Sequence, residues 1–171
     1  MRHGEIRKLQ WSHVDRAAGV FRLLVSITKT RTARVVPITP QVWQSLGALP
    51  RHLHGYVITY KGKPIKGNHG VRDGFGAACK AAGVVYGRDM DQGVILHDLR
   101  RTAKTNMLKS GMPKEYRDLI LGHSLQGMDA HYISEDQLEK ELIRAMGQYG
   151  VWLEAQLQLP PKPLPNQAAN I

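Results

Sequence analysis

The alternation of hydrophobic and polar residues predicts a chain that begins with a helix and continues into a small sheet. Ile6 and Leu9 lie at helical spacing, with charged residues between them. Two runs rich in β-branched and aromatic residues follow, and they predict strands over 20–28 and 33–38. A polar stretch around 28–32 separates the two runs. The pattern therefore predicts either a β-hairpin or two adjacent strands.

Residues that start and stop helices divide the remainder of the chain. Thr39 and Pro40 supply an N-cap and a first-turn proline for a helix. Gly83 and Gly111 stand where two later helical patterns end, a position that favours glycine. The elements predicted after the first strands are helices over 40–49, 69–82, 97–110, 113–121 and 137–157, a short strand and turn within 55–67, and a loop over 86–93.

The last predicted helix carries an apolar stripe on one face, although Gly147 and Gly150 weaken the middle of the helix. The stripe consists of Leu138, Leu142, Met146, Tyr149 and Leu153. The tail over 159–171 is rich in proline and polar residues, which predicts an extended or disordered segment. A chain of 171 residues favours one compact domain, here expected over 1–158.

Composition adds a strongly basic balance to this picture. The 24 Lys and Arg residues against 14 Asp and Glu residues give a formal charge of +10. An anionic partner such as nucleic acid would explain that charge, and so would a merely soluble basic protein. The single cysteine, Cys79, excludes an intramolecular disulfide and fits a small core residue. The lack of an 18-residue apolar run and of a signal peptide predicts a soluble, intracellular protein.

The segment "HDLRRT" at 97–102 is the clearest candidate for chemistry. On a helix, His97 and Arg100 share a face, whereas Arg101 points elsewhere. One face can therefore offer a titratable imidazole beside a fixed cation. A capped and solvated helix start would explain the same residues.

Two further cationic positions have weaker patterns of their own. Arg2 and Glu5 lie three residues apart on the first predicted helix, where the carboxylate could orient the guanidinium. An exposed intrahelical ion pair is the alternative interpretation. Lys29 lies in the polar turn between the predicted strands, where its ammonium could swing into a cleft or remain an ordinary loop lysine.

Four segments, taken in their order along the chain, resemble the motifs of the tyrosine recombinase (phage integrase) family. The resemblance implies an α+β, mainly helical catalytic-domain fold with a small antiparallel β-hairpin or sheet. The four motifs in this order indicate the family far more specifically than any one of them alone. The segments are "RHGEI", similar to the first arginine motif, "TKTRTARVVPI", similar to the β-hairpin lysine motif, "HDLRRT", similar to the His-x-x-Arg box, and "LGHSLQGMDAHY", similar to the closing histidine-tyrosine motif.

The resemblance implies a site-specific DNA recombinase that cuts and rejoins strands through a 3′-phosphotyrosine, without a cofactor or a metal. The chain has no clustered Asp and Glu set of the kind used by two-metal nucleases. The implied roles are Tyr132 as nucleophile, Arg2, Arg100 and His123 as ligands of the scissile phosphate, Lys29 as general acid toward the leaving 5′-oxygen, His97 as an aid to proton transfer, and Glu5 as structural support.

Physical chemistry supports these roles independently of the resemblance. A phosphodiester in transfer spreads negative charge over its non-bridging oxygens, and planar arginine forks suit that charge better than ammonium groups do. A free tyrosine has a pKa near 10, so Tyr132 needs neighbouring cations or a base to act as a nucleophile. The basic 5′-alkoxide needs a proton as it leaves, and Lys29 could supply it.

The resemblance also sets expectations for partners and extent. It implies that the partner is double-stranded DNA and that the protein associates with itself in a synaptic tetramer on that DNA. It implies neither a membrane nor a small-molecule substrate. The expected location is the cytoplasm, for a protein encoded by a bacterium or a phage. The first arginine motif begins at Arg2, so the chain is expected to lack the first helices of the catalytic domain and an N-terminal DNA-binding domain. A catalytically inactive DNA-binding remnant of a prophage integrase and a type IB topoisomerase are the alternatives left open. A helix-turn-helix regulator would not need this ordered set of residues.

Overall fold

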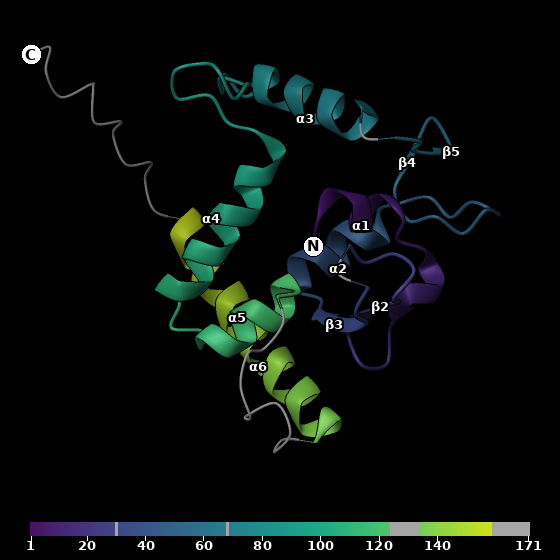
Figure 1. The fold of residues 1–171 in the computed structure, drawn as a ribbon, viewed down its shortest axis with the longest axis vertical. Coiled ribbons are helices and arrows are strands. Elements are labelled where there is room, and N and C mark those ends of the chain that lie inside the picture. The colour runs from purple at the N-terminus through teal and green to yellow at the C-terminus, as the bar shows by residue number, and fades with distance from the viewer. Residues whose placement is uncertain (30, 68, 124–133, 159–171) are drawn as a thin grey trace, which may run out of the picture.

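The structure is a computed structural model that describes residues 1–29, 31–67, 69–123 and 134–158 (Figure 1). The predicted tail over 159–171 lies outside the described residues. Helices dominate, and the strands form small antiparallel sheets, which confirms the predicted α+β, mainly helical fold class. None of the described helices combines the length and the apolar character that crossing a membrane requires.

A three-stranded antiparallel sheet in the order β1-β2-β3 forms near the N-terminus. Phe21 pairs with Val36 in its centre, and both side chains are buried. Arg22 points to the opposite face and is exposed, as the two-residue period of a strand requires. The sequence pattern missed the short first strand. The strands are β1 (Val14–Asp15), β2 (Val20–Leu23) and β3 (Arg34–Pro37).

The prediction that the second strand extends to residue 28 was wrong. Strand β2 ends at Leu23, and β3 begins only at Arg34, so the residues beyond Leu23 have no strand to pair with. Leu24 and Val25 are both half exposed at 51%. The backbone turns there, and the amide of Ile27 donates to the carbonyl of Leu24 at 3.1 Å. High β-propensity without a pairing partner therefore produced a turn.

The short strand and turn predicted within 55–67 form a complete hairpin of β4 (Thr59–Tyr60) and β5 (Lys63–Pro64). Lys61 and Gly62 form the turn, with φ angles of 49° and 72°. Two successive residues with positive φ match the right-handed twist of the flanking strands, which explains the tight connection.

The helices begin and end close to the predicted residues. Thr39 caps α2 by accepting a hydrogen bond from the amide of Val42 at 3.4 Å. Ser134 caps α6 in the same way through the amide of Gln137, so that helix begins two residues before the predicted start. The first helix is shorter than the pattern suggested, and Leu9 lies beyond its end. The helices are α1 (His3–Arg7), α2 (Pro40–Gly47), α3 (His69–Ala81), α4 (Leu96–Lys109), α5 (Lys114–Leu121) and α6 (Glu135–Leu157), with a 3-10 turn η1 (Trp11–His13).

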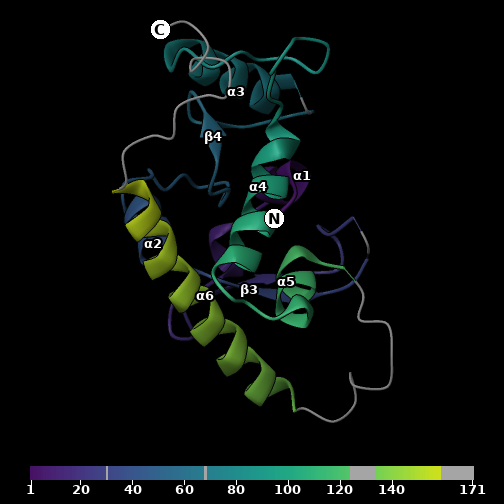
Figure 2. The same ribbon diagram turned by 90° about the vertical axis from the view of Figure 1, so that its left-hand side faces the viewer.

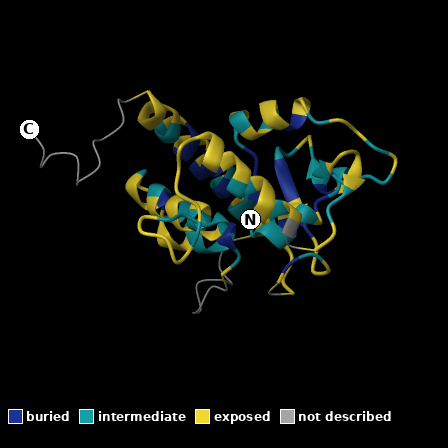
Figure 3. Ribbon diagram, turned by 90° about the horizontal axis from the view of Figure 1, so that it is seen from above, coloured by how far each residue is buried: buried dark blue, intermediate teal, exposed yellow. Residues whose placement is uncertain are grey.

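The core lies where α5 and α6 pack against β3 and where α4, α5 and α6 pack against one another. Figure 2 shows α5 beside β3 and the long α6 running past both, with α2 beside its C-terminal end. Gly150 of α6 faces Thr39 and Gln41, where a Cβ would lie within 3.7 to 3.8 Å of their side chains. The apolar stripe of α6 thus packs on its own domain in the single chain. Buried residues concentrate around the strands and the inner faces of these helices (Figure 3).

Candidate functional site

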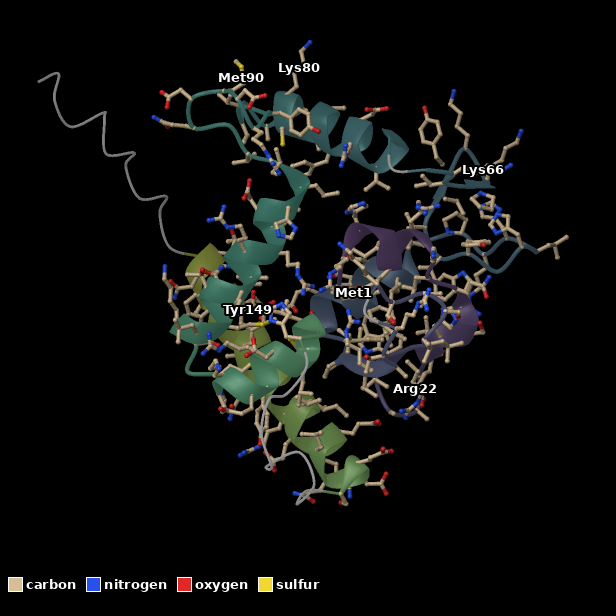
Figure 4. The ribbon with its side chains drawn as sticks, viewed as in Figure 1. Met1, Arg22, Lys66, Lys80, Met90 and Tyr149 are labelled. Carbon is tan, nitrogen blue, oxygen red and sulfur yellow. The ribbon has the colours of Figure 1, made fainter. Side chains whose placement is uncertain are left out.

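One cavity of about 470 Å³ brings together candidate site residues from three separate parts of the chain. Arg2 enters it from the start of α1, Lys29 from the turn after β2, and His97 and Arg100 from α4. Met1 also lines it, and Figure 4 shows Met1 at the junction between α1 and the helices α4 and α5. Four of the residues predicted from the sequence therefore share one cavity.

The predicted geometry of the "HDLRRT" segment holds in α4. His97 and Arg100 line the same cavity. Arg101 has 77% of its side chain exposed and instead forms an ion pair with Asp98 at 3.3 Å. Asp98 also caps the helix, since its carboxylate accepts a hydrogen bond from the amide of Ile95 at 2.9 Å. The same segment thus provides both a capped helix start and a face directed into the cavity.

Glu5 lies under the cavity with only 1% of its side chain exposed. Its carboxylate accepts hydrogen bonds from the backbone amide of Arg2 at 2.6 Å and from the Arg2 guanidinium at 3.4 Å. It also accepts a hydrogen bond from Nη2 of Arg34 at 2.7 Å. The predicted pairing of Arg2 with Glu5 is present, and the alternative of an exposed ion pair was wrong.

Arg34 belongs to this cluster, and the sequence reasoning missed it. Its side chain is 8% exposed, and its Nε and Nη1 atoms are buried without a hydrogen-bond partner in the described structure. A basic residue at the start of an otherwise apolar strand could have signalled a buried ion pair, because an unpaired charge in such a place is costly. The partner, Glu5, lies 29 residues away in sequence, which local patterns do not reveal.

The pKa of Glu5 lies below its ordinary value of 4.5. Burial is the largest single effect and raises the pKa. The hydrogen bond from Arg34, the backbone hydrogen bond from Arg2 and the charges of Arg34 and the N-terminal amine together outweigh it and lower the pKa. Glu5 is therefore an ionised anchor beneath the cations of the cavity at neutral pH.

Replacing Glu5 by glutamine is expected to lower the free energy of unfolding at neutral pH, because Arg34 would lose its buried counter-charge. Since the folded-state pKa of Glu5 is depressed, its stabilising contribution is present above about pH 4.5 and is lost as pH falls through the folded-state value. The difference between parent and variant should therefore shrink in acid. Urea unfolding across pH would measure it, and a difference that stays constant down to about pH 3 would contradict this account.

Arg100 holds the wall of the cavity formed by α5. Its Nη2 donates to the carbonyl of Leu121, while its Nη1 is buried without a partner in the described part of the chain. Burial lowers the pKa of Arg100, and the charges of Arg2 and Arg34 lower it further. Among the described residues, three guanidinium groups thus lie near the carboxylate of Glu5, and this cluster keeps an excess of positive charge and unpaired donors.

His123 lies directly after α5 and next to the cavity wall formed by Leu121. Its Nδ1 lies 3.1 Å from Oδ1 of Asp118, which also accepts a hydrogen bond from Lys104 at 3.2 Å. Burial raises the pKa of Asp118, but its hydrogen bonds with Lys104 and His123 lower it overall. An ionised carboxylate only accepts, so Nδ1 of His123 donates to Asp118, which leaves Nε2 for a ligand.

The turn before His123 depends on a close approach of backbone to side chain. Gly122 ends α5 with a φ of 73°, and the amide of His123 donates to the carbonyl of Asp118 at 2.8 Å. A Cβ on Gly122 would lie 2.7 Å from Cζ of Arg34. The guanidinium of Arg34 therefore packs against Gly122 on one side and binds Glu5 on the other. Tyr132, the predicted nucleophile, lies outside the described residues.

Comparisons with known proteins give two matches. The sequence profile of the Phage integrase family matches residues 1–139. A stretch of 66 residues is 38% identical to a shufflon-specific DNA recombinase of Escherichia coli. That stretch covers 39% of this chain and 17% of the length of the relative. No solved structure matches the chain significantly.

Proposed function

Because the chain belongs to the phage integrase family, we propose that it is a site-specific DNA recombinase that cleaves and rejoins strands through a 3′-phosphotyrosine. In this proposal residues 1–158 form the catalytic domain and double-stranded DNA is the substrate. The observation that carries it is the cavity in which Arg2, Lys29, His97 and Arg100 meet above the buried Glu5. Such a set of fixed cations fits a phosphodiester.

Binding of the scissile phosphate uses the excess charge of the cluster. Arg2 and Arg100 donate to its non-bridging oxygens, and the buried, unpartnered Nη1 of Arg100 gains an acceptor in doing so. His123, with a proton on each ring nitrogen, donates through Nε2 to the phosphate while Nδ1 donates to Asp118. Because these donors are already positioned by Glu5, Leu121 and Asp118, little reorganisation accompanies the reaction.

Cleavage then transfers the phosphoryl group to the protein. Tyr132 gives its phenolic proton to water, because the surrounding cations favour the phenolate. Its oxygen attacks phosphorus, and the bond from phosphorus to the 5′-oxygen breaks. Lys29 gives a proton to the departing 5′-oxygen, which becomes a free hydroxyl, and His97 assists the proton transfers. Attack by a 5′-hydroxyl of another strand on the phosphotyrosine reverses these steps and joins the strands.

A covalent trap tests this function directly. The protein is mixed with duplex DNA from its own genomic flanks that carries a nick beside the trial cleavage site, so that the short 5′-hydroxyl fragment diffuses away. A denaturing gel then separates any protein–DNA adduct, and acid hydrolysis of the labelled adduct identifies the phosphoamino acid. Phosphotyrosine on a 3′-phosphate supports the proposal. Salt-sensitive binding without an adduct would support the inactive DNA-binding remnant instead.

A type IB topoisomerase forms the same covalent intermediate, so a second assay is needed to distinguish it from a recombinase. Relaxation of supercoiled plasmid of arbitrary sequence by a monomer would favour the topoisomerase. Exchange of strands between two copies of one site, with assembly on DNA, would favour the recombinase. We propose that the assembly is a synaptic tetramer, and a protein that remains monomeric with and without DNA would count against it.

Lys29→Met is expected to slow cleavage by about 100- to 10,000-fold, because the leaving 5′-oxygen would lose its general acid. A substrate in which sulfur replaces the bridging 5′-oxygen should restore most of the rate, since a thiolate leaves without a proton. Single-turnover adduct formation measures both substrates. Lys104→Met, which removes a lysine that instead binds Asp118, is the control and should gain nothing from the sulfur substrate. An unrescued Lys29→Met would contradict the role.

A further inference from the structure

A second cavity of about 510 Å³ adjoins the candidate site. The two cavities share His3, Leu96 and His97, which form the wall between them. The second cavity is also lined by Arg72 of α3 and by Arg88 of the loop that follows α3. None of the described residues that line it is acidic. We call this second cavity the arginine groove.

The loop that carries Arg88 has a closed and fixed shape. The amide of Gly87 donates to the carbonyl of Val94 at 3.1 Å, and the amide of Val94 donates to the carbonyl of Val85 at 2.9 Å. Gly93 has no room for a side chain, because a Cβ there would overlap the carbonyl oxygen of Gly87. The two ends of the loop are thus held together, and Arg88 projects from a preformed turn.

The ring of Tyr86 fixes this loop against α3. A Cβ on Gly76 of α3 would lie 3.1 Å from two ring carbons of Tyr86, so the ring lies directly on the helix backbone. Phe75 meets the same ring edge to face, with centroids 6.0 Å apart. Because α3 also carries Arg72, this contact sets the distance between Arg72 and Arg88 across the groove.

Three exposed arginines elsewhere on the described part of the molecule have a carboxylate partner that these two arginines lack. Arg22, Arg101 and Arg144 each form an ion pair with a carboxylate, at 2.8, 3.3 and 2.8 Å. Within the described ranges, neither Arg72 nor Arg88 has such a partner, although Asp73 and Asp89 are their neighbours in sequence. Two unpaired guanidinium groups facing one cavity favour an anionic ligand.

We propose that the arginine groove is a second phosphodiester site, which holds the backbone phosphate next to the phosphate in the candidate site. The inference rests on the proposed function, because it takes its ligand from the same DNA. Successive phosphates of one strand lie close together, and the two cavities meet at His3 and His97. The groove therefore fixes the register of the strand, and the neighbouring cavity carries out the chemistry.

The test is a double variant, Arg72→Gln with Arg88→Gln, measured for DNA binding over a range of salt. Loss of two phosphate contacts should lower the slope of log affinity against log salt by about 2. The charge-matched control, Arg16→Gln with Arg144→Gln, changes two exposed arginines outside both cavities and should leave the slope nearly unchanged. Thermal melting confirms that both variants remain folded.

A neutral methylphosphonate placed at one phosphate at a time locates the contact. At the phosphate next to the scissile one, it should weaken binding of the parent but have little further effect on the double variant. Additive losses at every position, or a salt slope equal to that of the control, would overturn the inference. Adduct formation is measured in the same samples. If the parent protein shows the predicted salt slope but forms no adduct, the proposed catalysis is refuted and the groove is not. If the parent forms the adduct but the double variant binds DNA with the same salt slope as the parent, the groove is refuted and the catalysis is not.

Discussion

Tyr132→Phe is expected to reduce the covalent protein–DNA adduct to background while leaving DNA binding and stability unchanged. The substitution removes one oxygen and little else, so it isolates the proposed nucleophile. The cationic cluster of Arg2, Arg100 and Arg34 remains intact in this variant. The measurement is adduct formation on the nicked substrate, together with a binding isotherm at the same salt concentration.

Tyr149→Phe is the matched control for that experiment. Tyr149 is buried in the core, and burial raises the pKa of its phenol, which makes it a poor nucleophile. The control should form the adduct at the parental rate, apart from any loss of stability seen in melting. An adduct that persists in Tyr132→Phe would remove Tyr132 from the mechanism and would direct attention to the exposed Tyr60 and Tyr86.

Local sequence patterns predicted most of the helices because their ends carry residues with a defined backbone role. Thr39 caps α2 through its hydroxyl, and Gly111 and Gly122 adopt positive φ after α4 and α5. The ends of the strands were harder to predict. Residues beyond Leu23 have strand-like composition, but pairing depends on where β3 begins, which is a tertiary fact.

The sequence indicated the motifs of the candidate site and the pairing of Arg2 with Glu5, but not the contribution of Arg34. His97 and Arg100 share a cavity because a spacing of three places them on one helix face, and spacing is visible in a sequence. The contact of Arg34 with Glu5 joins a strand to the first helix across 29 residues. The arginine groove likewise depends on a loop folded onto α3, and no local period encodes that contact.

Gly122→Ala is expected to slow adduct formation on the order of 100-fold, which is the effect of displacing a positioned group by about 1 Å. The new Cβ would lie 2.7 Å from Cζ and 2.8 Å from Nη1 of Arg34. Arg34 is held on its other side by Glu5 at 2.7 Å, so relief of the clash must move either the guanidinium or the turn that carries His123. The first movement disturbs Glu5, which holds Arg2, and the second displaces His123 itself. Single-turnover adduct formation and urea unfolding measure the effect.

Gly111→Ala separates this clash from the cost of an alanine at positive φ. Gly111 has a φ of 84°, close to the 73° of Gly122, but nothing lies within 4 Å of its Cβ position. Both variants should lose about 1 to 2 kcal/mol of stability from backbone strain, while only Gly122→Ala should lose activity in this way. Adding Arg34→Ala to Gly122→Ala removes the clashing group, so the combined loss of activity should be smaller than the sum of the two single losses. Equal activity losses in Gly111→Ala and Gly122→Ala, or strictly additive losses in the double variant, would show that Gly122 contributes only its backbone conformation.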